Sequence, residues 1–186
     1  MSARALMGLQ LGLILLIAAL FLPFLGVPFV YDDKVEILQN RILRGPVQLS
    51  ELWDYNPFRV LLLLTFAWDI WAWGLGNVWP YRLENVLIHG ANAVLLVRMV
   101  SALAPRLLPE ATAARRGLLV AAAGLVFAMH PLAIESVTSI SGRSSSLATL
   151  FVLATIVLWL AYLDDCEREP ETAAWLRIEL RRVNRT

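Results

Sequence analysis

Two adjacent aspartates, Asp32 and Asp33, stand in the stretch FVYDDKVEILQN, directly after a long apolar run. Carboxylates at a membrane boundary can act as a general base, or they can hold Mg²⁺ or Mn²⁺, which prefer oxygen ligands. In a simpler interpretation, the pair only caps a helix and marks its exit from the bilayer. The residues by themselves leave these alternatives open, so Asp32 and Asp33 are candidate catalytic and metal-binding residues.

A second group of polar residues lies inside an apolar stretch, YRLENVLIHGANAVLLVRM. Asn85, His89 and Asn92 occupy positions i, i+4 and i+7, so they share one face of a helix. Polar side chains within a membrane face a partner or a cavity. The stripe therefore predicts either hydrogen bonds between helices or the lining of a cavity that meets a polar headgroup.

A third group follows in HPLAIESVTSISGRSS, where Pro131 ends the preceding helix. His130, Glu135 and Arg143 are expected to cluster just outside the membrane, on the same side as the aspartates. The planar guanidinium of an arginine suits a phosphate, but a Glu135–Arg143 ion pair that only holds the turn is an equal alternative. The sequence carries no zinc-type spacing, no Ser-His-Asp order and no glycine-rich phosphate loop.

The composition shows what must position these groups. Of 186 residues, 59% are hydrophobic, against roughly 45–50% apolar residues in globular domains, so the solvent is expected to be lipid. The net charge of +1 excludes the broad basic field that nucleic acid needs. The single cysteine, Cys166, excludes a disulfide framework, and the seven tryptophans suit anchoring at a membrane interface.

A helix needs about 20 apolar residues to cross a bilayer. Such stretches occur at residues 5–30, 81–104, 117–131 and 145–163. We therefore predict an all-α integral membrane protein with about four transmembrane helices in a membrane domain of residues 1–163.

The stretch from Phe58 to Pro80 is apolar as well, but Asp69 lies in its middle. A carboxylate at the centre of a span costs roughly 2.5–3.5 kcal/mol on insertion scales. A crossing here would also place the arginines between the second and third spans outside, against the positive-inside rule. We expect this stretch to lie in the interface or to re-enter, within a long outer loop of residues 31–80 that contains interfacial helices.

The arginines also predict the orientation. With the N-terminus inside, the inner segments hold most of them, so both termini are expected on the cytoplasmic side of an inner membrane, with several passes across it. Residues 164–186 are polar and rich in arginine. They predict an amphipathic helix on the inner surface or a disordered tail.

Four motifs, taken together, resemble the C-type glycosyltransferases (the GT-C fold), and in particular the protein O-mannosyltransferase-like branch that carries tetratricopeptide repeats. FVYDDKVEILQN is similar to F-V-x-D-D-x-x-x-I-x-x-N, and FRVLLLLTF to Y-R-P-L-T-x-L-T-F. YRLENVLIHGANAVLL is similar to Y-H-L-x-N-x-L-L-H-x-x-N-A-L-L, and HPLAIESVTSISGRSSSL to H-P-x-x-x-E-A-V-x-x-I-x-G-R-A-D-L-L. The motifs follow in the same order and cover most of residues 20–160, so the chain resembles the front half of a GT-C fold.

The resemblance implies transfer of a sugar from a polyprenyl phosphate to an acceptor, often a Ser or Thr hydroxyl, on the outer face of the membrane. Asp32 or Asp33 is then the base or helps to hold a divalent metal such as Mg²⁺ or Mn²⁺. Carried over to this sequence, Arg59, His130, Glu135 and Arg143 would line the donor-phosphate or acceptor site. The stripe residues Asn85, His89 and Asn92 are candidate substrate-binding residues because they could line a cavity that meets a polar headgroup.

Departures from the family leave two functions open. Ser145 stands near the place of an acid, Val60 replaces a proline, and the family's enzymes have further spans and repeats, so the resemblance implies a truncated member. One hypothesis is a glycosyltransferase that works within a larger assembly. The other is a non-catalytic accessory subunit of a membrane complex. In both, the expected partners are the lipid bilayer, a polyprenyl phosphate lipid and other membrane subunits.

Overall fold

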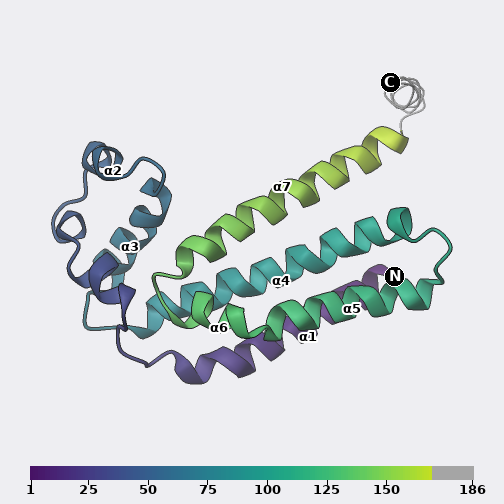
Figure 1. Ribbon diagram of the computed structural model, residues 1–186, viewed down its shortest axis with the longest axis horizontal. Helices are drawn as coiled ribbons and strands as arrows, with labels where there is room; N and C mark the ends of the chain where they lie inside the picture. Colours follow the sequence, from purple (N-terminus) through teal and green to yellow (C-terminus); the bar gives the residue numbers. More distant parts are fainter. Residues whose placement is uncertain (169–186) are drawn as a thin grey trace.

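The structure is a computed structural model that describes residues 1–168, and these residues form helices without a strand. Its long elements are α1 (Ala3–Phe21), α4 (Trp79–Leu107), α5 (Ala113–Met129) and α7 (Arg143–Arg168), with α6 (Pro131–Thr138) between α5 and α7. Figure 1 shows the long helices running side by side as a bundle. The predicted all-α membrane fold is confirmed.

Length and hydropathy make α4, α7 and the segment Ala3–Phe24 candidate membrane spans. The pair α5 and α6 passes the same test jointly, bent by 52° at its break, and counts as a fourth span if the two helices cross together. Pro131 explains the break, because a proline has no N–H to continue the ladder of α5. Instead, His130 caps α6, its Nδ1 accepting a hydrogen bond from Leu132 N at 3.2 Å.

Two boundaries differ most from the expected spans. The first helix does not continue to residue 30: α1 ends at Phe21, and a 3₁₀ turn, η1 (Leu22–Phe24), follows because Pro23 cannot continue the backbone ladder. At the other end, α7 runs to Arg168, so residues 164–168 belong to a helix rather than to a tail. The rest of the expected tail, residues 169–186, lies outside the described residues.

The bundle packs around a core that α1, α4, α5 and α6 share. Gly124 of α5 allows the closest approach, since a Cβ there would lie 2.7 Å from side-chain atoms of both Leu13 and Val97. The outward faces of the helices are apolar and exposed, as suits lipid. The buried members of the core are Leu13, Ile17, Phe21, Val86, Ala93, Val97, Val120, Ala128 and Val137.

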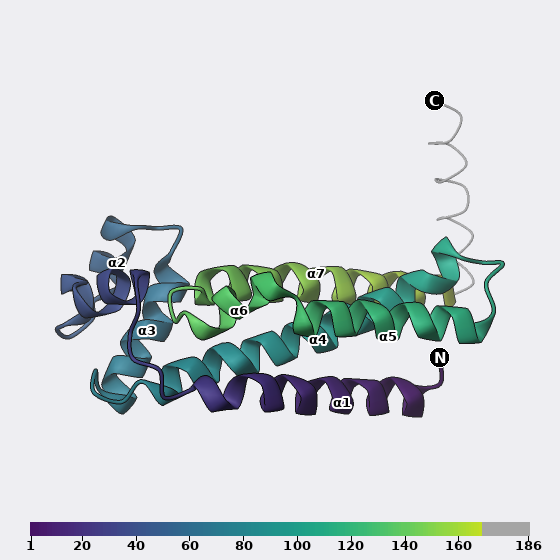
Figure 2. The same ribbon diagram turned by 60° about the horizontal axis from the view of Figure 1, so that its bottom comes forward.

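A small lobe of residues 31–78 projects beyond one end of the bundle (Figure 2). It contains the π-helix η2 (Lys34–Leu38), the 3₁₀ helix η3 (Arg41–Leu43), α2 (Leu49–Tyr55) and α3 (Val60–Trp73). With 14 residues, α3 is too short to span a bilayer of about 30 Å hydrocarbon thickness at 1.5 Å per residue. Trp68 and Trp71 of α3 are exposed, and the interfacial position expected for this stretch stays a prediction.

The two ends of the bundle differ in what they carry. The lobe, α6 and the turn before α7 lie at one end, whereas the N-terminus, the α4–α5 connection and the end of α7 lie at the other (Figures 1 and 2). The expected neighbourhood of residues 31–80 with the His130–Arg143 turn is therefore present in the fold.

This arrangement predicts the outcome of labelling from each side of the membrane. In a Cys166→Ser background, Lys34→Cys and Glu135→Cys should react with an impermeant thiol reagent from one face, and Glu110→Cys only from the other. The three parent residues are all exposed, so their accessibility depends on the side of the membrane. Reaction of Lys34→Cys and Glu135→Cys from opposite faces would contradict the topology.

Candidate functional site

A polar cavity of about 600 Å³ opens where the lobe meets α6 and the start of α7. Asp32, Glu36, Arg59 and Glu135 line it, together with serines of α6 and of the turn that leads into α7. Asp32, Arg59 and Glu135, which the sequence analysis named as candidates from three separate stretches, thus line the same cavity. The cavity is the candidate functional site.

The two aspartates do not act as a pair, because they point into different environments. Asp32 is exposed and lines the cavity. Asp33 is fully buried: its Oδ1 accepts hydrogen bonds from Ser139 Oγ at 2.9 Å and Ser141 N at 2.8 Å. Its Oδ2 accepts a hydrogen bond from Val30 N at 3.3 Å. The structure thus makes Asp33 a positioning residue and leaves Asp32 as the candidate catalytic carboxylate.

The backbone explains why neighbours diverge. Tyr31 has a φ of 43°, a left-handed conformation that costs of order 1–3 kcal/mol for a non-glycine residue. It turns the chain from the extended segment after η1 into the helical turn that leads to η2, a π-helix, and π-helical turns occur frequently at functional sites. Strain and an uncommon helix next to the cavity favour a functional role for the Asp32 segment.

The expected Mg²⁺ or Mn²⁺ site does not assemble from the described residues. The oxygens of Asp33 are taken up by protein donors, so Asp32 and Asp33 cannot offer their carboxylates to one cation. Within residues 1–168, no group of three or more His, Cys, Asp or Glu side chains is arranged to hold a metal. We therefore derive no step through a metal ion.

Arg59 and Glu36 form an ion pair at the cavity, with Nη1 2.9 Å from Oε1. The side chain of Arg59 is 39% exposed and that of Glu36 26% exposed, so the guanidinium remains accessible to a ligand in the cavity. Glu135 and His130 are exposed as well, but only Glu135 lines this cavity. Arg59 is thus the basic group that the structure places at the site.

Arg143 corrects the sequence analysis on two counts. Arg143 is fully buried and does not line the polar cavity. It pairs with Asp69 and Glu84 and not with Glu135. Its Nη1 lies 2.7 Å from Asp69 Oδ2 and 3.1 Å from Glu84 Oε2. Its Nε donates to Asn85 Oδ1 at 2.9 Å. Desolvation explains the difference, because a buried guanidinium needs acidic partners, and the buried Asp69 and the partly exposed Glu84 supply them.

The two asparagines of the polar stripe of α4 make hydrogen bonds to other segments. Asn85 Nδ2 donates to Ser139 O at 2.8 Å, and Asn92 Nδ2 donates to Ser146 O at 2.9 Å. His89 lies between aromatic rings of α1 and α5, with its centroid 5.6 Å from that of Phe21. These contacts match the hydrogen-bonding alternative for Asn85 and Asn92, since a polar group in a membrane needs an internal partner.

Arg82 has a role that the sequence analysis missed. It is buried, and its Nε donates to Thr138 O at 2.8 Å, while its Nη1 and Nη2 donate to the carbonyls of Val27 and Pro28. Nη2 also lies 3.7 Å from Asp33 Oδ2. The available signal was an arginine at the head of an apolar span, where a charge must find partners inside the protein.

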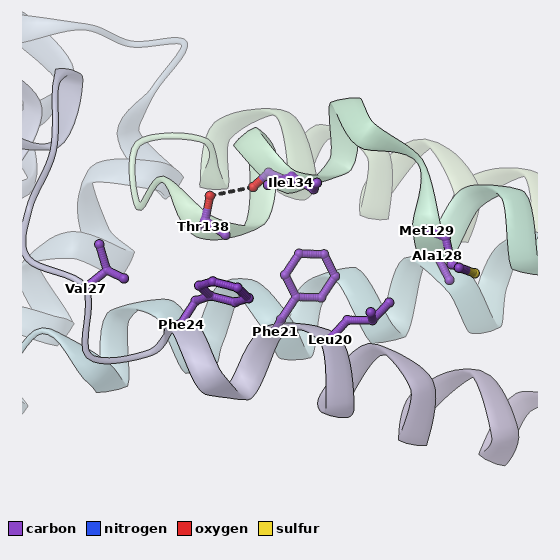
Figure 3. A pocket seen from close by; sticks show the side chains of 8 residues that line it. All are labelled: Leu20, Phe21, Phe24, Val27, Ala128, Met129, Ile134 and Thr138. Carbon is purple, nitrogen blue, oxygen red and sulfur yellow. Dashed lines mark hydrogen bonds between the residues drawn. The ribbon is translucent and has the colours of Figure 1, made fainter.

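An apolar groove of about 430 Å³, whose lining residues Figure 3 shows, shares Thr138 with the polar cavity. Leu20, Phe21 and Phe24 line it from the end of α1 and η1, and Ala128, Met129 and Ile134 line it from α5 and α6. Thr138 lines both the groove and the cavity. The apolar groove and the polar cavity therefore meet at Thr138. An amphiphile, with an apolar chain and a polar headgroup, fits this arrangement.

Comparison with curated proteins identifies homologues among the protein O-mannosyl-transferases. The chain is 30% identical over 170 residues to protein O-mannosyl-transferase TMTC2 of Mus musculus, covering 84% of this chain and 19% of that protein. It is 34% identical over 177 residues to Tmtc1 of Drosophila melanogaster, covering 88% of this chain and 18% of that protein. These matches confirm the resemblance to the O-mannosyltransferase branch.

The chain spans about a fifth of the length of the curated relatives it matches; for TMTC4 of Mus musculus, at 29% identity, the share is 21%. No protein-family model matches the sequence. No solved structure matches it either.

Removal of the buried charge of Arg143 should destabilise the fold strongly. Arg143→Met leaves Asp69 and Glu84 without their cation, and breaking one partner of a buried pair costs about 3–5 kcal/mol. The matched control is Arg106→Met, whose ion pair with Asp164 is partly exposed and contributes little. Thermal unfolding in mild detergent measures both, and equal midpoints would contradict the structural role.

The two aspartates should respond differently to the same isosteric change. Asp33→Asn removes a charge near Arg82 and an acceptor from the network around Ser139 and Ser141, so the melting temperature should fall by several degrees. Asp32→Asn, at an exposed position, should have the same melting temperature as the wild type. If Asp32→Asn were the less stable variant, the assignment of roles would be reversed.

Proposed function

We propose that this chain contributes the acceptor-activating part of a glycosyltransferase site, which passes a sugar from a polyprenyl phosphate donor to an acceptor hydroxyl. The observation that carries the proposal is the junction of the apolar groove with the polar cavity at Thr138, with the exposed Asp32 in that cavity. The homologous proteins are named as O-mannosyl-transferases, which supports mannose as the sugar and a Ser or Thr hydroxyl of a protein as the acceptor.

In this mechanism the donor lipid lies with its chain in the groove and its phosphate in the cavity. Asp32 takes the proton of the acceptor hydroxyl as the hydroxyl oxygen attacks the anomeric carbon of the sugar. The bond between that carbon and the phosphate oxygen breaks, and the phosphate leaves with the electron pair. Arg59, in the same cavity, stabilises the developing negative charge, at the expense of its pairing with Glu36.

The location of the donor explains why the carboxylate lies at a membrane boundary. A polyprenyl chain stays in the bilayer, so the reacting carbon of the sugar lies no farther from the hydrocarbon core than the length of the headgroup. We place the lobe end of the bundle on the outer face of an inner membrane and both termini in the cytoplasm, as the arginine distribution favours.

A larger assembly fits the comparison with relatives about five times as long, because the chain matches only 15–21% of their length. Further membrane segments would complete the walls of the groove and cavity, either in a longer chain or in other subunits. The alternative function is an accessory subunit that retains this fold without catalysis.

Substitution of Asp32 tests the proposal. Asp32→Asn should lower transfer of mannose from polyprenyl-phosphate mannose to an acceptor peptide about 10²–10⁴-fold, the usual contribution of a general base, without a change in melting temperature. The assay uses the chain in the membrane in which it is expressed, with its natural partners present. Radiolabelled mannose in the peptide is the readout.

The matched control is Asp54→Asn, another exposed carboxylate of the lobe that does not line the cavity. It should transfer mannose at the wild-type rate. Full activity of Asp32→Asn would overturn the catalytic role and support the accessory function instead.

A further inference from the structure

A second, smaller pocket of about 230 Å³, with a mostly apolar wall that carries several polar groups, lies where α4 faces the α5–α6 break and the first turns of α7. His89 and Asn92 line it from α4, Phe127 and His130 from α5 and the break, and Ser145 and Thr149 from α7. Its volume is below the roughly 300–1,000 Å³ of pockets that hold drug-sized ligands. The pocket therefore fits a small group.

Two buried polar atoms of this pocket have no hydrogen-bond partner within residues 1–168, His89 Nε2 and Asn92 Oδ1. Both residues are otherwise held in place. The ring of His89 stacks on Phe127 with centroids 5.1 Å apart, and Asn92 Nδ2 donates to Ser146 O at 2.9 Å. An unsatisfied buried polar atom is costly, so two of them beside one pocket indicate a group that supplies hydrogen bonds.

The chemistry of the lining narrows the class of ligand. Among residues 1–168, no Asp, Glu, Lys or Arg lines this pocket, so these residues offer no charge there to a phosphate or to a cation. It offers an amide oxygen, imidazoles and hydroxyls, which suit a neutral group that both donates and accepts hydrogen bonds. A sugar with several hydroxyls has this character.

The pocket also adjoins the candidate functional site. Ser136 and Ser145 line both the small pocket and the polar cavity that holds Asp32 and Arg59. A sugar in the small pocket would therefore have its anomeric carbon at the junction, with its phosphate in the cavity.

We propose that the His89–Asn92 pocket binds the sugar of the lipid-linked donor through its hydroxyls and so selects the glycosylated lipid over the free polyprenyl phosphate. This inference rests on the proposed function, and it adds the residues that recognise the sugar. Asn92 Oδ1 accepts a hydrogen bond from one hydroxyl, and His89 Nε2 bonds to another.

Binding of two lipids, polyprenyl phosphate and polyprenyl-phosphate mannose, tests the inference on the chain in nanodiscs made from the membrane in which it is expressed, with its natural partners present. The wild type should bind the mannose-bearing lipid about ten-fold or more tightly than the sugar-free lipid, as two additional hydrogen bonds imply. His89→Phe keeps the ring contacts with Phe21 and Phe127 but removes Nε2. It should weaken binding of the mannose-bearing lipid about five-fold and leave the sugar-free lipid unchanged.

Thr155→Val is the matched control, because its hydroxyl donates to Phe151 O on α7 away from the pocket. It should bind both lipids as the wild type does. If His89→Phe aggregates, Thr149→Val replaces it. Thr149 lines the pocket from α7, and its hydroxyl donates to Ser145 O just as that of Thr155 donates to Phe151 O.

The outcomes separate this inference from the proposed function. Equal affinity of the wild type for the two lipids, or equal weakening of both by the pocket variants, would overturn sugar recognition here while lipid-phosphate binding stands. Binding of neither lipid would overturn the proposed function and the inference with it.

Discussion

A buried guanidinium, that of Arg143, is the constraint on which the rest of this structure depends. It lies between Asp69 of α3 and Glu84 of α4, and it also donates to Asn85 Oδ1 and to Tyr81 O. Taking such charges out of water is expensive, and their mutual attraction offsets the cost only when all partners are in place. The lobe, α4 and α7 must therefore meet in one arrangement.

Arg82 extends this constraint to the segment that carries the candidate base. By donating to the carbonyls of Val27, Pro28 and Thr138, it ties the exit of α1 to the end of α6. Asp33 completes the connection through Ser139 and Ser141. Gly142 permits the close contact that follows, since a Cβ there would lie 2.8 Å from Ser136 Cα. The walls of the polar cavity are thus held by buried polar contacts rather than left as free loops.

The same constraint places an apolar groove and a polar cavity beside each other. An apolar groove can form along α1 and α6 because these helices separate where α5 breaks at Pro131. Polar chambers form next to it because the buried arginines and asparagines fix the turn into α7. A lipid with a polar headgroup, as the proposed donor is, would occupy both, and the homologues are named as O-mannosyl-transferases.

The sequence by itself determined the all-α membrane fold, because long apolar runs admit few other structures in lipid. It also determined the polar stripe of α4 through helical spacing, and it predicted a role for the Asp32–Asp33 motif through the resemblance of ordered motifs. Only the tertiary structure decided which aspartate faces the cavity, and that Arg143 serves the fold while Arg59 serves the site. Asp33 and Ser141 are 108 positions apart, and Arg143 and Thr65 are 78 apart. The partner of a buried charge is set by which distant segments come together, and no local pattern of residues contains that information.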